Sequence, residues 1–215
     1  MKRLVLPKLY VILDAALLNS TELEMARRLT EAGVRLLQYR NKTASSRGLF
    51  DSARDLAGAI APTGANFFVN DRPDIAFLSE ASGVHVGQDD LTVEQAREII
   101  GEGKWVGVST HSLPQFQAAA QTSADYIAVG PIFSTRSKIN PDPVVGLDLL
   151  KRVRPLTQKP IVAIGGITLE RAADVIGAGA DVVAVISDVL QAPDPAKRAR
   201  QYLELLEPRS LRKAN

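Results

Sequence analysis

The chain of 215 residues contains no cysteine, 46% hydrophobic residues and a formal net charge of +2. The lack of cysteine excludes disulfides, thiolate catalysis and cysteine-ligated zinc, and the small net charge gives no basic field for nucleic acid. With only two histidines and no apolar stretch of membrane-spanning or signal-peptide length, we expect a cytoplasmic protein that has no all-histidine metal site and binds neither membranes nor nucleic acid.

One pattern, a short apolar run followed by a segment of helical spacing, repeats eight times along the chain. In the first unit, LYVILD (9–14) precedes Leu23, Ala26 and Leu29, which are spaced as on one face of a helix, and Gly33 follows as a stop signal. Strands are expected at 9–14, 34–39, 66–70, 83–86, 105–109, 125–130, 160–165 and 181–187. Helices are expected at 21–32, 49–60, from 73, from about 92, 113–122, 147–153, 168–178 and 195–206.

Eight strand–helix units predict a single-domain α/β protein, a (β/α)₈ TIM barrel over residues 1–215 with a short basic C-terminal tail from about 207. Most of the strands are nearly continuous apolar runs, as expected when both faces of a parallel sheet are buried. A doubly wound sheet is the alternative. It would more often have a glycine-rich turn after its first strand, where this chain has LDAALLN.

Polar residues at the strand ends should gather at one face of a barrel, because active sites of this fold lie there. In an extended segment Gln38, Arg40 and Lys42 point the same way. Their donors suit a phosphate or diphosphate. A solvated strand exit is the alternative for this motif alone.

A second anion site is predicted after the seventh and eighth strands. Gly165 and Gly166 let the backbone approach a ligand at the start of a helix, and Ser187 adds a hydroxyl. A plain tight turn is the alternative. The long loop after the sixth strand, STRSKINPDP, offers hydroxyls and a lysine and could close as a lid, or its basic residues could merely be solvated.

Two acids follow neighbouring strands. Asp71 ends the third strand and Asp90 lies just past the fourth, and neighbouring strands are only about 5 Å apart. Two carboxylates together with water and phosphate oxygens suit Mg²⁺. A general acid/base pair is the rival interpretation. Asp89 is expected to face away from Asp90, toward the solvent or the following helix.

Taken together, the strand ends resemble those of the thiamine phosphate synthase family over about residues 8–190. The motifs that carry the resemblance are QxRxK at 38–42, ND at 70–71, GxHxGQxD at 83–90, GxSxH at 107–111, GPxFxTxxK at 130–138, IGGI at 164–167 and VIS at 185–187. Each is modest alone, but seven in order on successive strands are highly specific.

The resemblance implies a transferase that joins 4-amino-2-methyl-5-hydroxymethylpyrimidine diphosphate to 4-methyl-5-(2-phosphoethyl)thiazole, giving thiamine phosphate and diphosphate. By family pattern the pyrimidine diphosphate would be bound by Gln38, Arg40, Lys42, Asn70, Ser109 and Lys138. The thiazole phosphate would be bound by Thr135, Ser137, Gly166, Ile186 and Ser187, where Ser137 replaces the family's usual threonine. Asp71 and Asp90 would ligate Mg²⁺.

Catalysis is then expected to be positioning and charge stabilisation. The catalytic residues would be Arg40, Lys42, Lys138 and Ser109. With Mg²⁺, the three basic side chains would neutralise the leaving diphosphate. The pyrimidine would carry the resulting cation, and the thiazole nitrogen would attack it.

Several questions stay open at this level. A thiazole tautomerase, a sugar-phosphate isomerase or epimerase, and a non-catalytic barrel that binds thiamine precursors as a regulator are rival functions. His85 lies within a strand, where core packing or a hydrogen bond to a barrel neighbour is expected, and His111 could contact the substrate or support a residue that does. A homo-oligomer also remains open.

Overall fold

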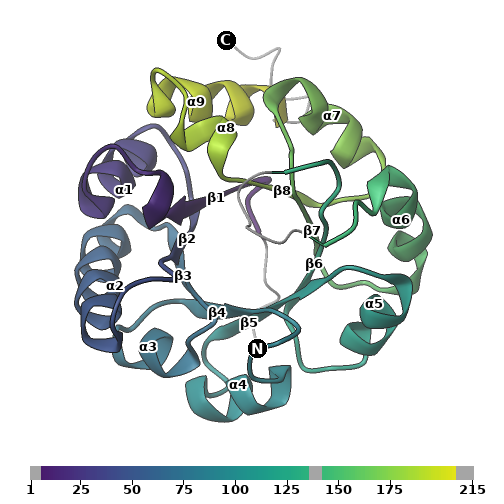
Figure 1. The fold of residues 1–215 in the computed structure, drawn as a ribbon, viewed down its shortest axis with the longest axis horizontal. Helices are drawn as coiled ribbons and strands as arrows, with labels where there is room; N and C mark the ends of the chain where they lie inside the picture. Colours follow the sequence, from purple (N-terminus) through teal and green to yellow (C-terminus); the bar gives the residue numbers. More distant parts are fainter. Residues whose placement is uncertain (1–5, 136–141, 207–215) are drawn as a thin grey trace.

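Eight parallel strands close into a barrel in the structure, a computed structural model that describes residues 6–135 and 142–206 (Figure 1). The strands pair in sequence order and β8 pairs back with β1. They are β1 (Leu9–Asp14), β2 (Leu36–Arg40), β3 (Asn66–Asn70), β4 (Gly83–Val86), β5 (Trp105–Thr110), β6 (Tyr126–Val129), β7 (Ile161–Ile164) and β8 (Val182–Val185). The expected (β/α)₈ barrel is confirmed, and the doubly wound alternative is wrong.

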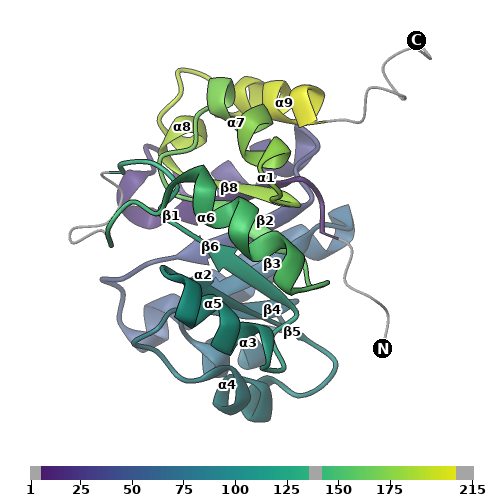
Figure 2. The ribbon, with the colours of Figure 1, turned by 90° about the vertical axis from the view of Figure 1, so that its right-hand side faces the viewer.

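Helices form a ring around the barrel, as the view down its axis shows (Figure 1), and a side view shows them flanking the strands (Figure 2). They are α1 (Glu22–Glu31), α2 (Ser46–Ile60), α3 (Pro73–Leu78), α4 (Val93–Ile100), α5 (Leu113–Ala120), α6 (Gly146–Val153), α7 (Leu169–Gly177), α8 (Ser187–Leu190) and α9 (Pro195–Leu206). Short 3-10 turns η1 (Ala15–Leu17), η2 (Ala61–Thr63) and η3 (Arg154–Leu156) complete the elements. None of the helices in the described ranges has the length and apolar character needed to cross a bilayer.

The C-terminal end of the eighth strand differs from the sequence-based expectation. We expected a strand to residue 187, but β8 ends at Val185 and Ser187 begins the short helix α8. A helix of four residues is barely one turn, so it gives no periodic apolar signal that could separate it from the strand before it.

The apolar residues form two separate layers. The larger layer lies between the strands and the helices and includes Leu13, Tyr39 and Val69. The smaller layer fills the barrel interior and includes Tyr10, Phe68 and Tyr126. The rings of Phe68 and Tyr126 meet edge to face at 5.7 Å between centroids. This interior layer closes the barrel below its C-terminal mouth, so the side chains at the strand ends form the floor of an open cavity.

Candidate active site

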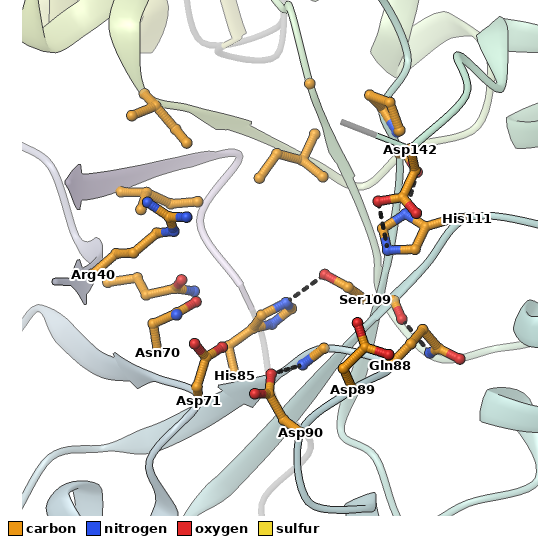
Figure 3. A pocket seen from close by; sticks show the side chains of 18 of the residues that line it. Arg40, Asn70, Asp71, His85, Gln88, Asp89, Asp90, Ser109, His111 and Asp142 are labelled. Carbon is orange, nitrogen blue, oxygen red and sulfur yellow. Dashed lines mark hydrogen bonds and ion pairs between the residues drawn. The ribbon is translucent and has the colours of Figure 1, made fainter. Parts of the chain in front are cut away.

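A cavity of about 400 Å³ opens at the C-terminal ends of the strands. Figure 3 shows polar side chains from β2, β3, β4 and β5 converging on it. The predicted site residues among those that line it are Gln38, Arg40, Lys42, Asn70, Asp71, Asp90, Ser109, Thr135 and Ile186. Gly166 and Ser187 are not among its lining residues. Ser137 and Lys138 lie outside the described residues.

Arg40 is held by a buried acid that the sequence analysis missed. Its guanidinium donates to the carboxylate of Asp14, which is the Cα partner of Arg40 in the register of β1 and β2. Asp14 is only 3% exposed, and its other carboxylate oxygen accepts a hydrogen bond from the backbone of Ala16 at 3.1 Å. Asp14 ends the first apolar run LYVILD, so the rule that selected the other strand ends could have found it.

Lys42 forms an ion pair with Asp71. Asp71 has a φ of 64°, and its backbone N–H donates to the carbonyl of His85 at 2.7 Å. The neighbouring strand therefore stabilises a backbone conformation that few non-glycine residues adopt. The Asp71 side chain lines the cavity.

The carboxylates of Asp71 and Asp90 lie beside each other on that wall (Figure 3). Burial, followed by the hydrogen bond with Asp71, raises the pKa of Asp90 above its ordinary value. The backbone N–H of Gly87 also donates to Asp90 at 2.7 Å. Two carboxylates this close repel when both are ionised, so a cation would stabilise them. Asp89 is more exposed than Asp90 but also lines the cavity.

A complete protein cage for a metal is lacking among the residues that the structure describes. No group of three or more histidine and acidic side chains there could hold an ion. Oxygen donors from Asp71 and Asp90 would suit Mg²⁺ only with further oxygen ligands from water or a substrate.

Ser109 is connected to the barrel interior through His85. The Ser109 hydroxyl lies 2.8 Å from Nε2 of His85, and Nδ1 of His85 lies 2.9 Å from the hydroxyl of Tyr126. Burial lowers the pKa of His85 to about 4. The expected hydrogen bond of His85 to a barrel neighbour is therefore present, and it is made to two strands at once. Tyr126 was not singled out from the sequence.

His111 lines the cavity on the opposite side from Asp71 (Figure 3). Its Nδ1 donates to the carbonyl of Gly130 at 2.6 Å, since a carbonyl can only accept, and its Nε2 lies 3.5 Å from the carboxylate of Asp142. This fixes the ring orientation. Asp142, a cavity residue, was also missed, because a residue within a long irregular loop has no strand end to mark it.

The turn after β7 packs tightly against the loop after β6. Gly166 has a φ of +62°, and a Cβ there would lie 2.3 Å from the carbonyl oxygen of Ser134. Only glycine fits in this position, because a side chain would be strained in its backbone conformation and would clash with fixed backbone. The turn thus brings the IGGI motif and Thr135 to the same side of the mouth.

Comparison with known proteins gives a consistent family. A family model described as thiamine monophosphate synthase matches residues 9–189. The chain is 51% identical to the thiamine-phosphate synthase of Koribacter versatilis, over 94% of this chain and 96% of that protein. It is 43% identical to that of Chloroflexus aurantiacus, over 93% and 92%. A solved thiamine phosphate pyrophosphorylase from Pyrococcus furiosus matches with a TM-score of 0.84 and 35% identity, covering 93% of this chain and 97% of that one.

Proposed function

The chain belongs to the thiamine-phosphate synthase family, whose members are transferases, and we propose the reaction that its cavity performs. In this reaction the enzyme joins 4-amino-2-methyl-5-hydroxymethylpyrimidine diphosphate to 4-methyl-5-(2-phosphoethyl)thiazole, and the products are thiamine phosphate and diphosphate. The observation that carries this proposal is the meeting of the cations Arg40 and Lys42 with the carboxylates of Asp71 and Asp90 in one cavity. An isomerase of a monophosphate would need no such pairing.

The diphosphate binds where Arg40 and Lys42 reach the cavity. Lys42 pairs with Asp71 in the free protein, and a bound diphosphate offers it a more highly charged partner. Arg40 keeps its buried partner Asp14 and donates its remaining N–H groups to the substrate, since a guanidinium carries five donors. Asn70, which lines the same cavity, would add a further donor, and by the family pattern so would Lys138, which lies outside the described residues.

Asp71 and Asp90 would hold Mg²⁺ together with diphosphate oxygens and water. The two adjacent carboxylates fit this ion, because Mg²⁺ prefers oxygen ligands and usually keeps several that are not from the protein. When bound, the ion supplies positive charge that makes diphosphate a better leaving group. When the diphosphate draws Lys42 away from Asp71, the Asp71 carboxylate becomes available as a metal ligand.

The reaction breaks the bond between the pyrimidine methylene carbon and the diphosphate oxygen, and the electron pair leaves with diphosphate. The aminopyrimidine delocalises the positive charge, and the lone pair of the thiazole nitrogen then forms the new C–N bond. No proton is transferred, so no general base or protein nucleophile is required. Arg40, Lys42 and Lys138 stabilise the leaving charge, and Ser109 orients the pyrimidine.

The thiazole phosphate binds on the other side of the mouth, at the turn after β7 and the start of α8. By the family pattern the hydroxyls of Thr135 and Ser137 would contact this phosphate, and Ser137 lies outside the described residues. The backbone of Gly166 is a further proposed contact, and the place of its absent side chain is filled by the Ser134 carbonyl. Ser187 adds a further hydroxyl beside Ile186. With its phosphate held there, the thiazole would be anchored so that its nitrogen is aimed at the pyrimidine.

An assay of the full chain with both substrates and Mg²⁺ tests the proposal. Thiamine phosphate and diphosphate should appear in equal amounts, and omission of the thiazole phosphate should suppress diphosphate release. A tautomerase or sugar-phosphate isomerase would leave the pyrimidine diphosphate unchanged, and a non-catalytic regulator would bind both substrates without product. Either outcome would contradict the proposed reaction.

A further inference from the structure

A chain of hydrogen bonds crosses the barrel interior beneath the cavity. Gln38 Nε2 donates to the hydroxyl of Tyr10 at 2.8 Å, and the Tyr10 and Tyr126 hydroxyls lie 3.2 Å apart. Tyr126 contacts Nδ1 of His85 at 2.9 Å, and Nε2 of His85 contacts Ser109 at 2.8 Å. This relay of five residues begins at Gln38 and ends at Ser109, both of which line the cavity together with His85. Tyr10 and Tyr126 are fully buried between them.

Counting hydrogens gives this relay a direction. The Gln38 amide nitrogen can only donate, so the Tyr10 oxygen accepts and its single hydrogen is free to go to Tyr126. The hydrogen of Tyr126 then goes to Nδ1 of His85, which must be unprotonated, and the ring hydrogen sits on Nε2. The opposite direction would leave the Tyr10 hydrogen without an acceptor in a buried place, at the full cost of desolvation.

We infer that Tyr126 is a positioning residue, which holds His85 as the Nε2–H tautomer and thereby makes Ser109 a hydrogen-bond donor toward the substrate. Since His85 donates to the Ser109 oxygen, the hydrogen of Ser109 is left for the cavity. Gln38, with its nitrogen engaged by Tyr10, offers its carbonyl oxygen as an acceptor. This inference rests on the proposed function, because the ligand in question is its pyrimidine.

One donor and one acceptor match an aminopyrimidine. The amino group of such a ring donates to Gln38, and a ring nitrogen accepts from Ser109. A ring with an oxo group in place of the amino group presents the reverse pattern along that edge, with an accepting oxygen and a donating ring N–H. The relay therefore selects the amino form, because a mismatched edge leaves buried polar groups unpaired.

The barrel is built to hold the Tyr126 ring in this position. A Cβ at Gly107 would lie 2.0 Å from Cζ of Tyr126 and 2.4 Å from its hydroxyl oxygen. The absence of a side chain at this position of β5 therefore makes room for the phenol ring. The ring also stacks on His85, with centroids 5.6 Å apart and an interplanar angle of 21°. Contacts from both sides keep the hydroxyl directed at Nδ1.

Nitrogen NMR of the free protein tests the tautomer without any substrate. The chain has two histidines, so a His111→Gln variant assigns the resonances of His85. At pH 7.5 we expect His85 to carry its proton on Nε2 and to have a hydrogen-bonded, unprotonated Nδ1. A proton on Nδ1, or on both nitrogens, in the unmodified chain would overturn the inference. Because no variant of the relay is needed, a folding defect cannot obscure this result.

Variants then test the role of the tyrosine. In Tyr126→Phe, the His85 Nδ1 resonance should move toward that of a nitrogen without a hydrogen bond. Tyr39→Phe is the matched control, because its buried phenol donates to Glu22 in the outer layer, and it should leave both His85 resonances unchanged. Unchanged resonances in Tyr126→Phe would contradict the assigned contact.

A double-mutant cycle separates positioning from general loosening of the barrel. We expect Tyr126→Phe to raise KM for the pyrimidine diphosphate about tenfold, as for loss of one good hydrogen bond, and to leave KM for the thiazole phosphate unchanged. In a Ser109→Ala background the same change should cost less than about twofold, because Tyr126 acts through Ser109. If the fold-changes in KM of the two single variants simply multiplied in the double variant, the inference would be overturned. A chain that makes no thiamine phosphate would refute the proposed function and leave the tautomer result standing.

Discussion

At the scale of single residues, acidic partners determine how firmly each cationic side chain of the cavity is held in place. Arg40 has a buried partner, Asp14, whereas Lys42 pairs with Asp71 at the cavity wall. The first pair is a fixed support, because the Asp14 carboxylate also accepts a backbone hydrogen bond. The second pair can open when a substrate arrives, because the side chain of Lys42 is 53% exposed.

Replacement of the two proposed metal ligands should nearly abolish turnover. We expect Asp71→Ala and Asp90→Ala each to lower kcat by about 100-fold or more, because the leaving group loses its stabilising charge. Asp89→Ala is the matched control, since Asp89 lines the same cavity but is more exposed than Asp90, and it should change kcat by less than about threefold. Steady-state kinetics at saturating Mg²⁺ measure this. Equal losses at 89 and 90 would show that the wrong acid has been assigned.

Asp14→Asn should weaken both the fold and the binding of the pyrimidine diphosphate. The asparagine keeps the shape of the side chain but removes the charge that holds Arg40, so we expect the free energy of unfolding to fall by about 1–3 kcal/mol and KM to rise. Asp74→Asn provides the comparison, because Asp74 pairs with Arg72 at an exposed site, where the cost should be under about 1 kcal/mol. Urea unfolding measures both, and similar losses would show that burial of Asp14 does not matter.

At the scale of elements, helix starts and tight turns set where the strand ends lie. Thr92 and Gln95 form a complete capping box at the start of α4. This fixes the helix that directly follows the Asp89–Asp90 turn. The turn after β7 depends instead on Gly166, whose Cβ position is occupied by the loop after β6.

Substitution by alanine should have opposite effects on the free energy of unfolding at Gly166 and at Gly58. Gly166→Ala forces a side chain into a left-handed backbone and against the Ser134 carbonyl, so we expect a loss of about 2–4 kcal/mol in the free energy of unfolding. Gly58→Ala in α2, where no atom lies within 4 Å of the added Cβ, should instead stabilise by about 0.5–1 kcal/mol. Chemical denaturation compares them. A neutral Gly166→Ala would mean that the turn can rearrange freely.

At the scale of the whole molecule, the sequence predicts the barrel far better than it predicts contacts across it. Buried parallel strands read as continuous apolar runs, so all eight units could be found. The partners of His85 and Gln38 could not, because Tyr10 and Tyr126 resemble ordinary core residues until the closed barrel brings their hydroxyls together. By contrast, the proximity of Asp71 and Asp90 could be predicted from the sequence, because the two residues follow neighbouring strands.

The assembled cavity should stabilise the whole fold when it is filled. A ligand that binds only the folded state raises the free energy of unfolding by about 2.7 kcal/mol at 100 times its dissociation constant. Inorganic diphosphate with Mg²⁺ is a suitable probe, because it should occupy Arg40, Lys42 and the two acids together. For a chain of this size we expect the midpoint of thermal unfolding to rise by about 5–10 °C.

Both components should be needed for that rise, because Mg²⁺ held by Asp71 and Asp90 would offset the negative charge of the carboxylates and of the diphosphate together. Circular dichroism melts of the full chain should show a small shift with diphosphate alone and little with Mg²⁺ alone. Asp71→Ala should lose the combined shift and Asp89→Ala should keep it. This measurement requires no turnover, so it separates a failure to bind from a failure of chemistry. A shift that survives in Asp71→Ala, or that ignores Mg²⁺, would place the diphosphate away from the carboxylates and would contradict the proposed metal site.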